Sequence, residues 1–183
     1  MDDIVRQAMA KWPEVPDCYG WLGLDSRGQW WMRDDRAQAL GAFQSGSPGA
    51  KGSVLRHEKL IDFIHRNYEA DAQGRWYFQN GPQRVFIELE TTPFIWRIDD
   101  DFAVTSHTGV LTEGNKALVD EYGKVYLHNN LGLGLVHSLD VPRAAQALEM
   151  GRWTLEEVSA SGLPLDYGYV MSPESKEISS MQT

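Results

Sequence analysis

Residues 67–98 carry the strongest alternation of hydrophobic and polar positions in the chain. From Val85 to Leu89 every second residue is aliphatic, which is the period-two pattern of a strand with one buried face. Pro93 interrupts the apolar run that follows, so a sheet edge, a bulge or a corner is expected there. This pattern predicts an antiparallel meander of three or four strands over residues 67–98.

The turn at the start of this stretch recurs along the chain. Residues 71–76 and 25–30 share the pattern D-x-x-G-x-W, and residues 120–126 hold a looser copy with Val in place of Trp. Asp accepts hydrogen bonds from nearby backbone N–H groups, and Gly supplies the positive φ that closes a hairpin through a bulge. The copies are interpreted either as an internal duplication or, with more weight, as convergence of hairpin turns on one sequence. Hairpins are predicted near residues 18–33, 67–80 and 117–129.

Helical periodicity is clearest over residues 53–66, where Ser53 is a cap candidate and a broad apolar stripe follows. Residues 41–52, rich in Gly, Ser and Pro, are typical of an exposed mobile loop. Shorter helices are expected at residues 2–12 and 142–150, with one further turn at 153–158 and an extended segment at 163–171.

Together these elements predict an α+β fold, in which an antiparallel β-sheet built from hairpins or a meander carries two or three packed helices. With 183 residues the chain can form one substantial core. We therefore expect a single globular α+β domain over residues 1–171 and a disordered polar tail over residues 172–183.

Composition narrows the function classes. The net charge of -9 disfavours both nucleic-acid backbones and anionic membranes as partners. Cys18 is the single cysteine and cannot form an internal disulfide, which favours a reducing compartment. No secretory signal and no run of about 18 apolar residues is evident, so a cytoplasmic protein is expected.

Aromatic and arginine residues cluster on the predicted hairpins. Trp30 and Trp31 must face opposite sides of a strand, so at least one needs cover from a helix, a partner or a ligand. Core packing accounts for most of the aromatic residues, and a cleft that stacks flat ligands is the alternative. The candidate ligand- or partner-binding residues are Trp30, Trp31, Trp76, Tyr77, Arg33, Arg75, Arg84 and Glu88.

Reaction chemistry has weaker signals. Glu88 and Glu90 are expected to share a strand face at a spacing of about 7 Å, which would suit paired acid–base chemistry, although a solvated face is the plainer interpretation. His107, His128 and His137 are a three-histidine alternative that no spacing requires. No P-loop, dinucleotide fingerprint, zinc-protease motif or nucleophile elbow is present, so no catalytic residue, metal or cofactor is predicted.

Three segments resemble an uncharacterised proteobacterial protein family of unknown function. They are WPxxPxCYGWL at residues 12–22, DxxGxW at 25–30 and RWYFQNGPQRV at 75–85, within roughly the first hundred residues. The resemblance implies a cytosolic bacterial protein and transfers no catalytic residue.

The sequence thus predicts a non-catalytic cytosolic binding or protein-interaction protein that uses an aromatic-rich sheet face. A homodimer through that face is expected, together with an unidentified small molecule or protein partner. The alternative is a small enzyme whose site lies on the sheet face and uses carboxylate, Arg and His chemistry.

Overall fold

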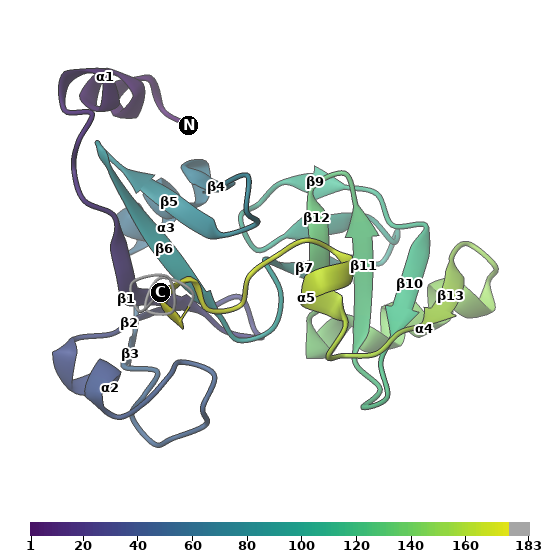
Figure 1. Cartoon of the computed structure of the whole chain (residues 1–183). Coiled ribbons are helices and arrows are strands. Elements are labelled where there is room, and N and C mark those ends of the chain that lie inside the picture. The colour runs from purple at the N-terminus through teal and green to yellow at the C-terminus, as the bar shows by residue number, and fades with distance from the viewer. Residues whose placement is uncertain (176–183) are drawn as a thin grey trace. The chain divides into compact units, whose positions relative to one another are not determined.

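The structure, a computed structural model, describes residues 1–175 and divides into two compact units (Figure 1). Within the described residues, unit 1 holds residues 1–25, 29–90 and 169–175, and unit 2 holds residues 26–28 and 91–168. Each unit has its own sheet, and the predicted α+β class is confirmed. Both sheets are mixed, so the expectation of a purely antiparallel sheet is wrong. The single domain predicted over residues 1–171 stays a prediction.

Unit 1 is built on a six-stranded sheet, sheet A, in the order β3-β2-β1-β6-β5-β4. Its two central strands, β1 and β6, run parallel, with Leu22 opposite Ile87, and the other pairs are antiparallel. The elements of unit 1 are α1 (Asp3–Lys11), β1 (Cys18–Leu24), β2 (Trp30–Met32), α2 (Asp35–Ala39), β3 (Ser53–Val54), α3 (Glu58–Arg66), β4 (Tyr68–Ala70), β5 (Trp76–Asn80) and β6 (Gln83–Leu89).

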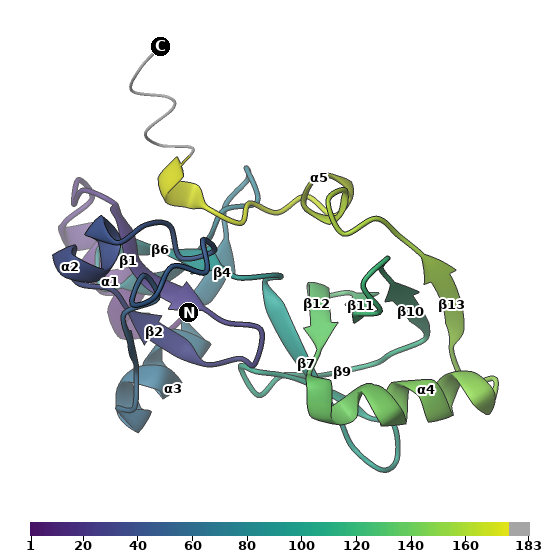
Figure 2. The same cartoon turned by 90° about the horizontal axis from the view of Figure 1, so that it is seen from below.

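Unit 2 is built on a seven-stranded sheet, sheet B, in the order β13-β10-β11-β12-β7-β8-β9. The pairs β12·β7 and β10·β13 are parallel. Figure 2 shows α4 and α5 on opposite sides of strands β10 to β12. The elements are β7 (Phe94–Ile98), β8 (Val104–Ser106), β9 (Leu111–Thr112), β10 (Lys116–Val119), β11 (Val125–Asn129), β12 (Gly132–Val136), the 3-10 turn η1 (Ser138–Asp140), α4 (Val141–Glu149), β13 (Thr154–Glu157) and α5 (Leu163–Asp166).

The predicted meander ends earlier than expected. Strands β4, β5 and β6 form it in sheet A, but β7 belongs to sheet B. The chain leaves unit 1 after Glu90, directly before the corner marked by Pro93. Two other predictions are wrong in unit 2: residues 154–157 pair with β10 as a strand instead of forming a helical turn, and Leu163–Asp166 is a helix inside the segment expected to be extended.

The main helix is shorter than residues 53–66. Ser53 and Val54 pair with β2, and the Leu55 N–H donates to the Trp30 carbonyl, which uses this segment's backbone groups in the sheet. Helix α3 therefore begins at Glu58, where the ring of His57 accepts a hydrogen bond from the Leu60 N–H at 3.2 Å. A histidine thus takes the capping role expected of Ser53.

The three predicted D-x-x-G hairpins are confirmed. Asp25, Asp71 and Asp120 each accept a hydrogen bond on a side-chain oxygen from the N–H four residues later, at 2.9, 3.0 and 2.8 Å. The glycines three residues after them have φ of 79°, 75° and 77°. In each turn the carboxylate and the glycine together fix a type I turn with a bulge.

The same turn occurs twice more in sheet B without the D-x-x-G sequence. Asp99 accepts from the Ala103 N–H, and Ser106 Oγ accepts from the Val110 N–H. Phe102 takes the glycine position of the Asp99 turn at φ 65°, and the Arg152 guanidinium lies 4.9 Å from its ring centroid. Because five hairpins share one turn geometry, convergence of turn sequences is favoured over an internal duplication of the chain.

Residues 41–52 pack against sheet A through two buried side chains. Phe43 and Ala50 are 0% and 1% exposed, although most neighbouring residues are exposed. A Cβ on Gly23 of β1 would lie 2.5 Å from the Phe43 ring, so the ring's position depends on that glycine. The expectation of an exposed loop is wrong at these two positions.

No helix within residues 1–175 has the length and apolar character needed to cross a membrane.

Candidate functional site

Trp30 and Trp31 face opposite sides of β2, as predicted. Trp30 is 1% exposed, and its Nε1–H donates to His65 Nε2 on α3 at 2.9 Å. Trp31 is half-buried on the other face, where its Nε1–H donates to Asp25 at 2.9 Å. Trp30 is thus covered within unit 1, whereas Trp31 stays partly exposed and lines a second pocket of 400 Å³ together with Phe43 and Lys51.

An aromatic cluster fills the sheet face under α3. Tyr68 packs edge-on against Trp30 at 5.5 Å between centroids and lies 4.7 Å from Trp76. Phe63 of α3 meets Phe78 edge-on at 6.2 Å. Trp30 is therefore a core residue, which corrects its prediction as a ligand contact, whereas Trp76 is half-buried and stays a prediction.

Burial lowers the pKa of His65 below its usual value, and the smaller opposing effect comes from the Asp62 carboxylate. The neutral ring is also the form whose Nε2 accepts the Trp30 N–H. This histidine has a structural role in the core.

The opposite face of sheet A carries a second cluster, centred on Phe86. Tyr19 stacks on Phe86 with ring centroids 4.7 Å apart and planes 2° from parallel. The guanidinium carbons of Arg75 and Arg84 lie 4.7 and 5.2 Å from the Phe86 centroid, and Tyr77 lies 5.6 Å from it. The structure thus brings together Tyr77, Arg75 and Arg84, three of the residues predicted for binding.

Both arginines of this cluster are paired with carboxylates. Arg75 Nε donates to Asp71 at 2.7 Å, and Arg84 donates twice to Asp17, at 2.9 and 2.5 Å. Burial tends to raise the pKa of Asp71, but hydrogen bonds from Arg75 and Gln73 outweigh it and hold that pKa below the usual value. Because each charge is locally matched, the cluster offers stacking surface without a free cation.

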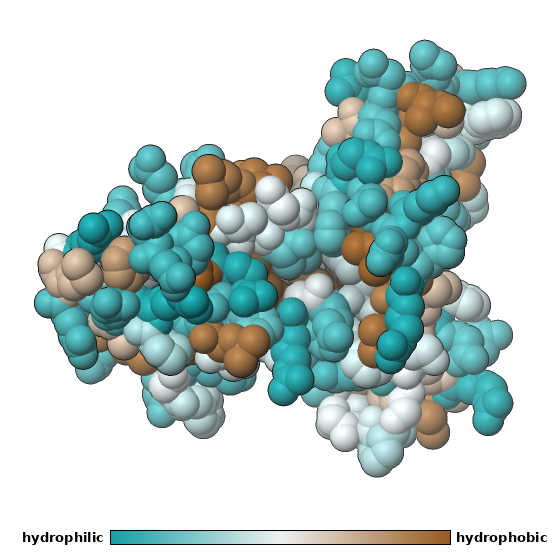
Figure 3. All heavy atoms as spheres, turned by 180° about the vertical axis from the view of Figure 1, so that it is seen from behind, coloured by the Kyte–Doolittle hydropathy of each residue, from teal (hydrophilic) through white to brown (hydrophobic). Residues whose placement is uncertain are grey.

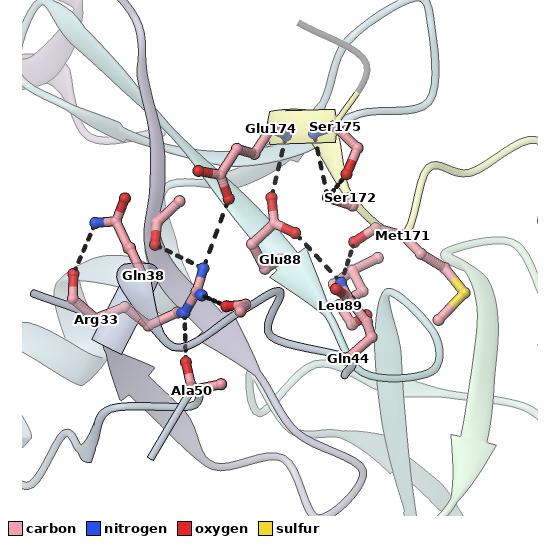
Figure 4. A network of polar contacts seen from close by, with 12 residues as sticks. Arg33, Gln38, Gln44, Ala50, Glu88, Leu89, Met171, Ser172, Glu174 and Ser175 are labelled. Carbon is pink, nitrogen blue, oxygen red and sulfur yellow. Dashed lines mark hydrogen bonds and ion pairs between the residues drawn. The ribbon is translucent and has the colours of Figure 1, made fainter. Parts of the chain in front are cut away.

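Arg33 and Glu88 belong to a buried polar network beside this cluster (Figure 4). Arg33 is 1% exposed and donates to the carbonyls of Ala50, Gly20 and Gly41 at 2.8, 3.0 and 2.6 Å. The Glu174 carboxylate lies 3.6 Å from it. Arg33 therefore holds segments of unit 1 together, and its predicted ligand contact is corrected.

Glu88 is also enclosed. It is 1% exposed and accepts from the Gln44 amide at 3.3 Å and the Glu174 N–H at 3.1 Å. Burial raises its pKa, and the hydrogen bonds from Ser172, Glu174 and Gln44 only partly oppose this. Its predicted exposure to a ligand is therefore wrong.

The segment that encloses Glu88 is the chain after unit 2. β5 pairs with β6 only as far as Phe86. Further along β6, the Leu89 N–H donates to the Met171 carbonyl at 2.8 Å. Residues 172–175, part of the predicted tail, are placed by these contacts, and residues 176–183 lie outside the described part of the chain.

The predicted acid–base groups do not converge. Glu90 pairs with Lys51 at 2.5 Å, whereas Glu88 contacts Gln44 and Glu174. Arg84 lies four residues before Glu88 on β6, which is a separation of about 13 Å along a strand. The enzyme hypothesis gains no support from this face.

The three-histidine alternative does not form a common site either. His107 Nδ1 accepts from the Ile95 N–H, His128 packs on the Tyr167 ring, and His137 accepts from the Leu139 N–H. Within residues 1–175 there is no group of three or more His, Cys, Asp or Glu side chains that could hold a metal ion.

Cys18 lines an apolar groove of 290 Å³ beside α3, with Trp21 and Met32 at its rim. Burial raises the pKa of the Cys18 thiol, which disfavours a thiolate nucleophile. Cys18 is thus a small apolar contact in unit 1.

A polar cavity of 570 Å³ opens beside the Phe86 cluster, between the segment after α1 and the β5–β6 hairpin. Tyr77 and Arg84 belong to its wall. The other lining residues are Met9, Pro13, Glu14, Val15, Pro16, Asp17, Gln79 and Pro82. Two of the predicted binding residues therefore line this cavity.

Gln79 distinguishes this cavity. Its side chain is 1% exposed and its Nε2 donates to the Gly81 carbonyl at 3.0 Å, but its Oε1 has no hydrogen-bond partner among the described residues. Leaving a buried acceptor unpaired costs about 1–3 kcal/mol. Thr91 Oγ1 and Asn129 Nδ2 also lack partners within residues 1–175, but both lie on residues that are only partly buried.

Sequence reasoning found Tyr77 and Arg84 but missed Glu14, Asp17 and Gln79. The Asp17–Arg84 pair joins residues 67 positions apart, for which no local pattern exists. Gln79 follows an aromatic run on β5, where alternation places it on the face of Tyr77. That alternation is the signal that would have found it.

The family model DUF2944, described as "Protein of unknown function (DUF2946)", matches residues 1–174. The chain belongs to this family. Its description assigns no activity, so the candidate site rests on the geometry above.

Two further comparisons gave partial similarities. Laminin subunit alpha-1 of Mus musculus is 27% identical over 132 residues, covering 64% of this chain and 4% of that protein. The chain therefore spans a small fraction of this relative's length. A crystal structure of a DUF1285 family protein from Silicibacter pomeroyi has a TM-score of 0.48 and 14% identity, covering 80% of this chain and 84% of that chain.

Proposed function

We propose that this chain is a non-catalytic binding protein whose ligand occupies the cavity beside the Phe86 cluster. The observation that carries the proposal is that Gln79, whose buried Oε1 has no hydrogen-bond partner among the described residues, lines a 570 Å³ cavity. This volume is in the range of small-ligand binding sites, which typically contain a few polar groups in fixed positions. Tyr77 and Arg84 supply the stacking surface predicted from the sequence.

The proposal includes a cytoplasmic protein of bacterial origin, supported by the single cysteine and by the sequence resemblance described above. The homodimer remains a prediction, and its reason is weaker because Trp30 is buried and Trp31 is half-buried within unit 1. On the face drawn in Figure 3, hydrophobic side chains form separate patches among hydrophilic ones. That face does not present one large apolar interface.

The test is a ligand-observed NMR screen of the full chain with cationic, neutral and anionic fragments. Val15→Trp places a large ring in the cavity wall and should abolish binding of the hits. Val110→Trp is the matched control, because Val110 is 46% exposed in unit 2 and does not line the cavity. The proposal fails when no fragment of any class binds, or when Val15→Trp and Val110→Trp bind every hit equally well.

A further inference from the structure

The walls of this cavity are rich in hydrogen-bond acceptors. Three lining residues, Pro13, Pro16 and Pro82, have no backbone N–H and contribute only carbonyl oxygens. The Pro16 carbonyl already accepts from Gln83 at 2.9 Å and retains a second lone pair. The Glu14 carboxylate is on an exposed residue at the rim.

Three donors of the lining residues already have partners. The Arg84 guanidinium donates to both oxygens of Asp17. Tyr77 is hydrogen-bonded to the Glu69 carboxylate, and burial together with that carboxylate raises the Tyr77 pKa. The backbone N–H of Gln79 donates to the Asn67 carbonyl at 2.9 Å. These three donors are therefore already engaged within the protein.

The charges of the lining residues are also negative in sum. Glu14 and Asp17 contribute two negative charges to the walls and Arg84 one positive charge, and the whole chain carries -9. A field of this sign favours a cation over a neutral or anionic group.

We propose that the cavity binds a protonated amine or guanidinium group, which donates to Gln79 Oε1 and is balanced by the carboxylate of Glu14. This inference rests on the function proposed above and specifies its ligand class. A small diffusible amine and a Lys or Arg side chain of a peptide offer the same chemistry. The ring of Tyr77 would contact the aliphatic or planar part of either ligand.

Isothermal titration calorimetry on the full chain tests the inference. The cationic probes are agmatine and the peptide acetyl-Gly-Arg-Gly-amide, each at about 20 and 200 mM salt. N-butylacetamide and butyrate are the neutral and anionic comparisons. Both cations should bind more tightly than the comparisons, with weaker binding at high salt. Agmatine binding without peptide binding would identify a small amine as the source, and the reverse result would identify a protein partner.

Two substitutions locate the contacts. Gln79→Met keeps the side-chain length and removes the unpaired acceptor, and it should weaken cation binding about tenfold. Glu14→Gln should weaken it about threefold at low salt and by less at high salt. Glu113→Gln is the control, because it removes the same charge from an exposed residue of unit 2. Glu14 lies on an exposed segment, so its variant tests the inference even if Gln79→Met does not fold.

The failure of this inference is distinguishable from that of the proposed function. If N-butylacetamide or butyrate binds in the cavity as tightly as the cations and neither substitution matters, the cavity binds ligands but the cation assignment is wrong. If no probe or fragment of any class binds, Gln79 Oε1 is satisfied by water alone and both proposals fail.

Discussion

Replacement of Asp120 tests the turn that five hairpins share. Its Oδ1 accepts from the N–H groups of Tyr122 and Lys124 at 2.9 and 2.8 Å, and its Oδ2 accepts from the Tyr126 hydroxyl at 2.7 Å. Asp120 is 6% exposed and Tyr126 is 3% exposed, so water cannot readily replace the hydroxyl contact. Asp120→Ala removes both oxygens and the three hydrogen bonds that they accept, including the one from the buried Tyr126 hydroxyl. We expect a loss of about 3 kcal/mol from the free energy of unfolding.

Asp120→Asn separates the two oxygens. Asparagine keeps an acceptor for the turn but replaces the charged oxygen at Tyr126, so a loss of about 1–2 kcal/mol is expected. A double-mutant cycle with Tyr126→Phe should give a coupling energy of about 1 kcal/mol or more, because each change removes the same bond.

The assay is urea unfolding followed by far-UV circular dichroism, with the slope of each transition compared between variants. Asp99→Ala is the matched control, since Asp99 makes the same turn in sheet B but is exposed. It should cost about 1 kcal/mol or less. The reasoning is refuted if Asp120→Ala costs no more than Asp99→Ala, or if the cycle is additive to within about 0.3 kcal/mol.

Three further predictions concern unit 1. Burial lowers the pKa of His65, so the folded state resists a proton that the unfolded state accepts near pH 6.5. The free energy of unfolding should therefore fall as the pH drops below about 6.5 toward the folded-state pKa. His65→Leu, which also loses the Trp30 contact, should flatten this dependence in urea titrations at pH 8.0 and 5.5. Gly23→Ala would place a Cβ 2.5 Å from the Phe43 ring and should lower the melting temperature by several degrees in calorimetry, whereas an unchanged value would contradict the packing. Arg33→Met leaves three carbonyls without their donor and should cost about 3 kcal/mol in urea unfolding, and a cost below about 1 kcal/mol would show that the network is not needed.

The features predicted correctly from the sequence are those set by neighbours along the chain. The turns at Asp25, Asp71 and Asp120 were found because a carboxylate and a glycine three residues apart are sufficient to build them. The opposite orientation of Trp30 and Trp31 follows from strand geometry alone.

The features missed depend on residues far apart in sequence. Alternation shows that β1 and β6 are strands but not that they pair in parallel. The helical pattern over residues 53–66 could not reveal that Ser53 pairs with Met32 of β2. The turn at Asp99 was missed because Phe102 occupies the position that glycine usually marks.

The candidate site divides in the same way. Tyr77 and Arg84 were predicted because aromatic and arginine residues gather on the β5–β6 hairpin. The acceptor-rich wall was missed because Glu14 and Asp17 lie on a proline-bounded connection whose partner strands are more than 60 residues away. Arg33 and Glu88 were assigned to a ligand because a sequence does not show that residues 171–174 return to cover them.

The central claim is that the cavity beside the Phe86 cluster binds a cationic group through Gln79. The most direct measurement is a ¹H–¹⁵N correlation NMR titration of the full chain with agmatine at about 20 mM salt. We predict saturable shifts of the Gln79 side-chain amide and of the backbone amides of Glu14, Asp17 and Tyr77, with the Glu113 amide unchanged. Shifts confined to residues outside the cavity, or no saturable shift, would contradict the account.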